Sequence, residues 1–351
     1  MKEIISTTVI LFFIFHCSLF TAFAQSIKGL TDSTKPKINI PSSPNITDEK
    51  GLKQGQWTVL MVKDWFYTLD TSKALYYRII NYKDGKPFGL VKDYYITGEK
   101  QGEEHLKSEN PDFYEGYLVS YYKNGNKGEE GYWDNNIRVN LWHYWFEDGT
   151  PNLNYEGKFY VDNCDSQKAD SVLFMAEKLY REKYGDTSLI YAQTRHYLGH
   201  YYQYINKFDE AESSYKKAYD ILKFANKENH PDYYEILNCF SVFYTNINKL
   251  WEAEPLLKEF LETGRKLFKD DNPYLAKSIN DMAGFYYNRG NYKEAEPLFK
   301  EALEMRRRLF KGDHPDLAQG INNMAMYYTH MDNNKEAEPL LKEALEMSRR
   351  L

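Results

Sequence analysis

Two histidines are spaced so that they can share one ligand. His196 and His200 are four positions apart, so both imidazoles would lie on one face of a helix. Helices often bind a transition metal with histidines at this spacing. Tyr197 follows His196, so the glutamate that acts as general base in helix-borne zinc sites is missing, and no third ligand is evident. We therefore expect no metal and assign both histidines to a polar binding surface, with metal chemistry at this pair as an alternative.

Three asparagines, Asn238, Asn280 and Asn322, recur at intervals of 42 residues. An asparagine side chain offers two N–H donors and one carbonyl acceptor, which suit the backbone of an extended peptide. His196 stands one interval earlier, so the row of asparagines is incomplete. We predict a peptide-binding groove formed by these four residues together with His200, Lys277 and Gln319. In the alternative interpretation, each asparagine bonds to a neighbouring helix and spaces the repeats.

The 42-residue interval runs through the C-terminal half of the chain. Small residues recur at Gly199, Ser241, Ala283 and Ala325, and large apolar residues stand beside them at helical spacing. This pattern predicts pairs of antiparallel helices that approach closely at the small residues. A proline begins the predicted first helix of three pairs, where a missing N–H is tolerated. Residues 167–183 fit a lone second helix and 155–164 do not fit a first one, so we predict four hairpins and one half.

The strings Asn-x-x-Ala, Glu-Ala-Glu-Pro-Leu and Asp-His-Pro-Asp, clearest between Ile279 and Asp316, resemble the kinesin-light-chain type of tetratricopeptide repeat. The resemblance covers residues 166–351. It implies an α-α superhelical solenoid with a concave groove that binds a peptide or protein through a row of asparagines. Other tetratricopeptide proteins clamp a terminal carboxylate with Lys and Asn on this face. Val242, Gly284 and Met326 stand at the adjoining positions here, so we expect no recognition of an acidic C-terminal tail.

Residues 51–162 contain a different repeat. Aromatic-rich runs end in Thr-Gly, Asn-Gly or Asp-Gly at Gly98, Gly125 and Gly149, which predicts an antiparallel β-meander with tight turns. The runs resemble the bacterial variant of the MORN-type repeat, with its Tyr-Tyr-x-Asn-Gly core, although Asn136 and Asn140 replace two glycines. The resemblance implies a structural or interaction role and no shared catalytic residues.

Composition excludes several classes of function. The net charge is -6, which does not favour nucleic-acid binding, where a basic surface supplies most of the affinity. The three cysteines form no C-x-x-C pair, and the chain has neither a Gly-rich phosphate loop nor a serine elbow. We therefore expect no cofactor and no enzymatic activity.

The first 24 residues are typical of an export signal. An apolar run through Val9 and Phe15 is followed by Ala22-Phe23-Ala24, a small-x-small cleavage pattern. Residues 25–50 are rich in Ser, Thr, Pro and Lys and should form a disordered linker. We predict a periplasmic or secreted protein with no membrane span after cleavage, with a retained N-terminal anchor as the alternative.

These patterns together predict an exported adaptor or scaffold with two domains, β and then α. The second interpretation is an envelope-associated structural spacer without a peptide ligand. Leu340, Leu341 and Leu345 of the last predicted helix give it a wide apolar face, which we expect to be covered by a second copy, by a partner or by residues missing from this chain.

Overall fold

The computed structural model describes residues 40–351 except 42, 44, 71, 110, 111, 226 and 229. The predicted signal peptide and the predicted linker up to residue 39 lie outside this part of the chain. Two compact units are present, Met1–Val139 and Asn140–Leu351. The first is an antiparallel β-sheet and the second a stack of helices, which confirms the predicted fold class. No helix in the described ranges is both long and apolar enough to cross a membrane.

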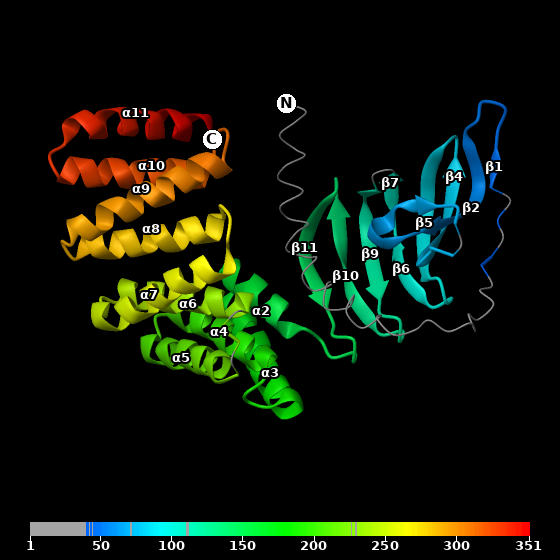
Figure 1. Ribbon diagram of the computed structural model, residues 1–351. Helices are drawn as coiled ribbons and strands as arrows, with labels where there is room; N and C mark the ends of the chain where they lie inside the picture. The colour runs from blue at the N-terminus through cyan, green and yellow to red at the C-terminus, as the bar shows by residue number, and fades with distance from the viewer. Residues whose placement is uncertain are drawn as a thin grey trace. The chain divides into compact units, whose positions relative to one another are not determined.

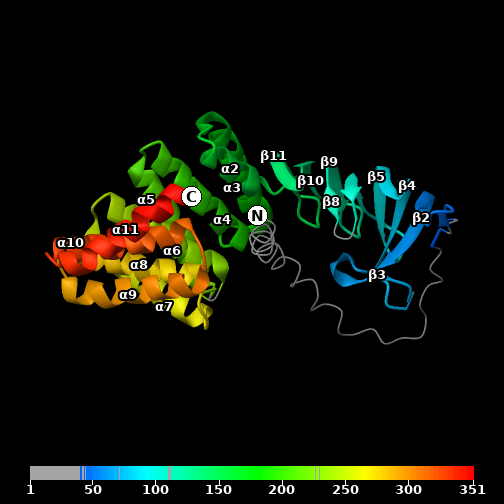
Figure 2. The same ribbon diagram turned by 90° about the horizontal axis from the view of Figure 1, so that it is seen from above.

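The strands of the main sheet follow one another almost in chain order, β1-β2-β4-β5-β6-β9-β10-β11. Figure 2 shows this row, with β3 set apart where it pairs with β2 alone. β7 and β8 form a separate pair. The strands are β1 Ile46–Thr47, β2 Lys53–Met61, β3 Tyr67–Thr68, β4 Tyr76–Lys83, β5 Lys86–Tyr95, β6 Lys100–Glu104, β7 Leu106–Ser108, β8 Phe113–Tyr114, β9 Gly116–Tyr121, β10 Lys127–Asp134 and β11 Ile137–Tyr144.

The three predicted glycine turns have the same geometry. Gly98, Gly125 and Gly149 have φ values of 105°, 88° and 82°, which favour glycine because it lacks a Cβ. The N–H of each glycine donates to the carbonyl three residues earlier, over 2.8–2.9 Å. Asn136 and Asn140 keep the left-handed conformation, with φ of 63° and 61°, and asparagine tolerates this conformation better than most residues. The turn pattern found in the sequence is therefore a real structural repeat.

Residues 46 and 47 correct the predicted extent of the disordered linker. They form β1 and pair with Gln54 and Lys53 of β2. The side chain of Asn45 holds this segment in place, because it accepts from the N–H of Thr58 at 2.9 Å and donates to the Thr58 carbonyl at 3.2 Å. An asparagine amide can thus imitate a paired backbone, which composition alone does not reveal.

An ionic cluster lies inside the β unit beside a small apolar core that contains Ile80 and Val91. The Arg78 guanidinium is almost fully buried and donates to Asp93 at 2.7 and 2.9 Å, to Glu104 at 2.7 Å and to Asp112 at 2.8 Å. One buried cation therefore faces three carboxyl groups, of which Asp93 and Glu104 are buried and Asp112 is half-buried, and hydrogen bonds to Arg78 offset the cost of burying them.

Ten helices in the described residues form five hairpins that stack one after another (Figure 1). Each helix packs on its chain neighbours, so every hairpin covers the apolar face of the one before it. The helices are α2 Leu153–Asp162, α3 Ser166–Tyr184, α4 Leu189–Tyr204, α5 Phe208–Phe224, α6 Pro231–Asn246, α7 Leu250–Leu267, α8 Pro273–Asn288, α9 Tyr292–Leu309, α10 Pro315–His330 and α11 Asn334–Arg350.

The first hairpin corrects the prediction that residues 155–164 contain no first helix. α2 pairs with α3, and its Gly157 lies so close to Leu173 that an added Cβ would stand 2.3 Å from Leu173 Cδ2. Gly157 precedes Gly199 by 42 residues and so extends the series of small residues. The left-handed residues that end each first helix show the same interval: Cys164, Asn206, Asn248, Gly290 and Asp332.

Local chemistry explains where the first helices begin. The His230 and His314 side chains accept from the backbone N–H of Asp232 and Asp316 at 3.2 and 3.1 Å, and the proline that follows each histidine opens the helix. Asn272 caps α8 in the same way. These N-caps satisfy amides that would otherwise lack a partner. The His-Pro-Asp strings are accounted for by helix capping.

Ion pairs between successive hairpins repeat with the same interval. Lys223–Glu259, Arg265–Glu301 and Arg307–Glu343 each join residues 36 positions apart. A second set, Arg308–Asp271 and Arg350–Asp313, joins residues 37 positions apart. The pairs are exposed or half-exposed, so each contributes little stability, but together they show that neighbouring hairpins meet in equivalent ways.

Candidate functional site

Five polar residues on successive first helices form the row on which the candidate site is built. We call them the groove row: Asn154, His196, Asn238, Asn280 and Asn322, on α2, α4, α6, α8 and α10. Each follows the previous one by 42 residues, so the first helices present them at equivalent places. Asn154 was not predicted because α2 was not recognised, although it lies one interval before His196.

The row is partly engaged in contacts between helices. Asn280 is buried, and its Oδ1 accepts from the side-chain amide of Asn323 on α10 at 2.8 Å. Asn154 is also buried, and its Oδ1 accepts from the Thr194 hydroxyl on α4 at 2.9 Å. These two members join one first helix to the next, as the spacer interpretation of the asparagines requires.

Other members leave polar groups available. The Oδ1 atom of Asn238 is buried and has no hydrogen-bond partner within the described part of the chain. Asn322 is exposed, and its amide has only a long 3.5 Å contact with the sulfur of Met326. Because a buried carbonyl without a partner costs free energy, the Asn238 oxygen is an unsatisfied acceptor within the groove row.

The remaining predicted groove residues lie on α8 and α10. Lys277 is half-buried and its ammonium pairs with Asp281 at 2.6 Å, one turn later on the same helix. Gln319 is exposed. At Gly284 a Cβ would meet nothing within 4 Å, so the surface beside Asn280 is open. Glu235 on α6 is exposed, yet desolvation by the protein around it raises the pKa of its carboxyl, as expected on a concave surface.

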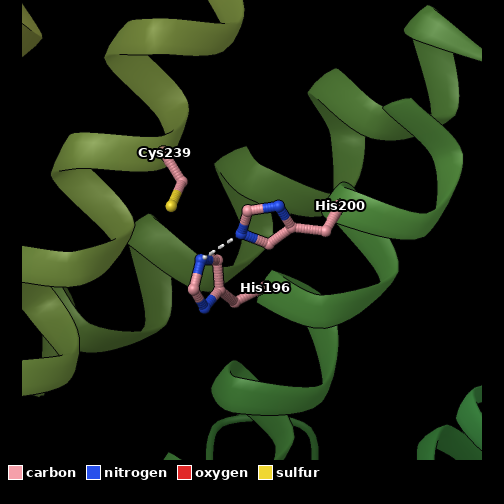
Figure 3. A group of neighbouring side chains, drawn as sticks. All are labelled: His196, His200 and Cys239. Atoms are coloured by element: carbon pink, nitrogen blue, oxygen red, sulfur yellow. Dashed lines mark hydrogen bonds between the residues drawn. The ribbon is translucent and has the colours of Figure 1, made fainter. Parts of the chain in front are cut away.

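The structure brings a third residue to the two histidines. His196 and His200 project from α4, and their Nε2 atoms lie 3.1 Å apart, while Cys239 of α6 points toward both (Figure 3). Their ligand atoms all lie within 4.8 Å of one another. The cluster contains His196, a member of the groove row, and therefore adjoins that row. The structure thus places a third side chain of metal-ligating type, which was not evident from the sequence, beside the two histidines.

Burial sets the protonation of this cluster. His196 is buried, which lowers the pKa of its imidazole well below the ordinary value, and nearby His200 and Lys158 lower it further. Burial lowers the pKa of His200 to about 4, with a smaller contribution from Lys158 and an opposing one from Asp162. Burial also raises the pKa of the Cys239 thiol to about 12. All three side chains are neutral at pH 7 when nothing is bound.

One buried cation was missed by the sequence analysis. Arg306 on α9 is 3% exposed, and its Nη1 has no hydrogen-bond partner among the described residues. The side chain lies over Gly320 of α10, where an added Cβ would stand 3.0 Å from Nη1. Burial lowers the pKa of Arg306, and the charges of Asp316 and Asp281 oppose this. Its place in a run of three arginines at a helix end gave no signal of burial.

Comparison with known proteins agrees with this architecture. Helical hairpins stacked in one direction define an α-solenoid of the kind that serves as an interaction scaffold. The model of the tetratricopeptide repeat family matches residues 152–223 and 274–350, which contain nearly all of the helices from α2 to α5 and from α8 to α11. The match begins at the N-cap of α2, Asn152, which supports the assignment of α2 and α3 as the first hairpin. No family model matches the β unit, and no curated protein matches the chain.

Solved structures share the helical fold. BtubC (BKLC) from P. vanneervenii is 22% identical with a TM-score of 0.52, covering 56% of this chain and 79% of that chain. The nearly identical TPR-like repeats of a Podosopora anserina protein described as a kinesin light chain are 18% identical with a TM-score of 0.50, covering 56% and 94%. The apo form of RapI is 14% identical with a TM-score of 0.50, covering 56% and 69%. At these identities the likeness establishes the fold alone.

Proposed function

We propose that the chain is an exported adaptor that binds an extended peptide or a partner protein along the groove row. The carrying observation is the buried Oδ1 of Asn238, which has no partner in the described residues. A backbone N–H of a bound segment would complete its hydrogen bonding. The exposed side chains of Asn322 and Gln319 and the open surface at Gly284 extend the same face. Partners are therefore polypeptides, and no nucleic acid is involved.

The test uses the whole chain and a phage-displayed library of unstructured peptides as the probe. Peptides selected on the parent should bind the Asn238→Ala variant more weakly by about 1–2 kcal/mol, or roughly 5- to 30-fold in Kd. Thermal unfolding of the variant should be unchanged or raised, because the buried acceptor is removed. Selected peptides that bind parent and variant equally, or a library that yields no binders, would overturn the proposal.

The second candidate is a structural spacer without a peptide ligand. The bond between Asn323 and Asn280 favours it, because this part of the groove row serves contacts between repeats. The β unit serves either function as an attachment module. Its three equivalent glycine turns support assignment to MORN-type repeats, a class with structural and interaction roles. Export rests on the apolar run and the Ala-Phe-Ala pattern of residues 1–24.

The last helix supplies a possible second contact surface. Ala344 and Met347 of α11 are buried in their own hairpin, whereas Leu341 and Leu345 are 43% and 52% exposed. Self-association through this face remains a prediction. Sedimentation at micromolar concentration should show a dimer that a Leu341→Lys, Leu345→Lys double variant returns to monomer. A monomeric parent would reject this contact.

A further inference from the structure

The cluster of His196, His200 and Cys239 joins two different hairpins. α4 supplies both imidazoles, one turn apart, and α6 of the next hairpin supplies the thiol (Figure 3). α4 and α6 are separated in sequence by α5 but pack on each other. The three side chains are therefore held together by the solenoid and need no loop to change conformation.

The donor atoms already converge. The two Nε2 atoms face each other at 3.1 Å, and all three ligand atoms lie within 4.8 Å of one another. Zinc bonds of about 2.0–2.1 Å to nitrogen and about 2.3 Å to sulfur place tetrahedral ligand atoms roughly 3.3–3.6 Å apart. The nitrogen pair is already near this separation, and the Cys239 sulfur must move closer to the imidazoles when the metal binds. Cys239 forms no disulfide, so its thiol is free to bind.

We propose that His196, His200 and Cys239 bind one transition-metal ion, for which Zn²⁺ is the best match. Two imidazoles and one thiolate are the nitrogen and sulfur donors that Zn²⁺ prefers, and hard ions such as Mg²⁺ do not use them. The Cys239 thiol releases its proton to solvent when the metal–sulfur bond forms. The fourth coordination position is open to water or to the carboxylate of Glu235, one turn before Cys239 on α6.

Charges near the cluster are balanced. Lys158 of α2 acts on all three ligands and Asp162 acts on His200, and these two residues pair with each other at 2.5 Å. The pair supplies no net charge that would repel a cation. His196 is buried, while His200 and Cys239 are half-buried, so the ion can enter from their side. Bound metal would connect the second and third hairpins within the groove row.

Cobalt(II) added to the whole chain tests the proposal, because a thiolate ligand gives Co²⁺ a charge-transfer absorption. The parent for this test carries Cys17→Ser and Cys164→Ser, which leaves Cys239 as its one thiol out of three. We expect one Co²⁺ per chain with the thiolate band, displacement of the band by Zn²⁺, and a rise in the thermal midpoint with Zn²⁺.

Two variants and a control complete the test. Cys239→Ser should lose the band, and His200→Gln should weaken Co²⁺ binding by at least about 10-fold, a loss typical even of outer-shell partners. His330→Gln, which alters an exposed histidine on α10, should bind as the parent does. Circular dichroism verifies folding, and if Cys239→Ser unfolds, His200→Gln decides alone. Absence of the band in the parent, or equal binding by His200→Gln, would overturn the proposal.

Discussion

Asn323 on α10 donates its side-chain amide to Oδ1 of Asn280 on α8, over 2.8 Å. This bond joins the first helices of two successive hairpins, and it uses the only acceptor oxygen of the Asn280 side chain. Members of the groove row occupy equivalent places in sequence, but they therefore differ in which side-chain hydrogen-bonding groups are used for contacts between helices. Asn280 holds the repeats together, while Asn238 retains a buried oxygen without a partner in the described residues.

The first prediction separates these two roles by stability. Asn280→Ala leaves the Asn323 amide without its acceptor and should lower the free energy of unfolding by about 1 kcal/mol in urea denaturation. Asn322→Ala, at an exposed member of the row, is the control and should stay within about 0.5 kcal/mol of the parent. Equal stability of all three proteins would show that the Asn280 bond is not formed in solution.

The second prediction concerns the first hairpin. Gly157→Ala forces a Cβ to within 2.3 Å of Leu173 Cδ2, so the buried Leu173 side chain or α2 itself must shift, and overpacking of this kind costs about 1–3 kcal/mol. Gly284→Ala is the matched control because its Cβ would meet nothing within 4 Å, and alanine should stabilise α8 by roughly 0.5–1 kcal/mol. Thermal unfolding followed by circular dichroism measures both. A stabilised Gly157→Ala variant would mean that α2 does not pack as described.

The third prediction is a pH dependence from the ionic cluster of the β unit. Burial raises the pKa of Glu104 well above its ordinary value, the Asp93 carboxylate raises it further, and Arg78 opposes this. Because the folded-state pKa lies above the unfolded value of about 4.3, the folded protein holds the proton more tightly. The contribution of Glu104 to the free energy of unfolding is thus fully present below the unfolded-state pKa and is lost as the pH rises through the folded-state pKa.

Glu104→Gln isolates the effect, because its amide oxygen can still accept from Arg78 and no proton is exchanged. The variant should gain stability relative to the parent as pH rises above about 4.3, by up to roughly 1.4 kcal/mol per pH unit. Urea denaturation followed by tryptophan fluorescence at several pH values gives the difference. A constant offset for Glu104→Gln would contradict the raised pKa.

The fourth prediction compares two arginines in the helical unit. Arg306→Met should leave the thermal midpoint unchanged or raise it, because an apolar side chain replaces a buried guanidinium whose Nη1 has no hydrogen-bond partner among the described residues. Arg195→Met should lower the thermal midpoint and reduce the free energy of unfolding by about 1–3 kcal/mol. The reason is that Arg195 donates to Glu177 at 2.7 Å and to Ser214 at 2.9 Å. A large loss in Arg306→Met would indicate a partner for the guanidinium in solution.

The sequence predicted the fold well where one interval repeats. The 42-residue interval located nine of the ten helices in the described residues, and the Thr-Gly, Asn-Gly and Asp-Gly pairs located the β-turns. α2 escaped because it has only 10 residues and is rich in aromatics, although Gly157 and Cys164 lie on the interval. Contacts between helices were harder to foresee. The approach of Cys239 to the histidines depends on how α4 and α6 pack, which spacing within one helix does not determine.

The ion pairs that repeat between hairpins have a consequence for how such a chain can change in length. Lys223–Glu259, Arg265–Glu301 and Arg307–Glu343 place a cation on one second helix and its carboxylate on the next, at equivalent positions each time. Each hairpin from α6 to α9 thus carries both a carboxylate for the hairpin before it and a cation for the hairpin after it. If one 42-residue block were inserted or removed, the hairpins on either side of the junction would still present a cation and a carboxylate at equivalent positions. The length of the solenoid can therefore change by whole repeats while the same interface between hairpins is kept.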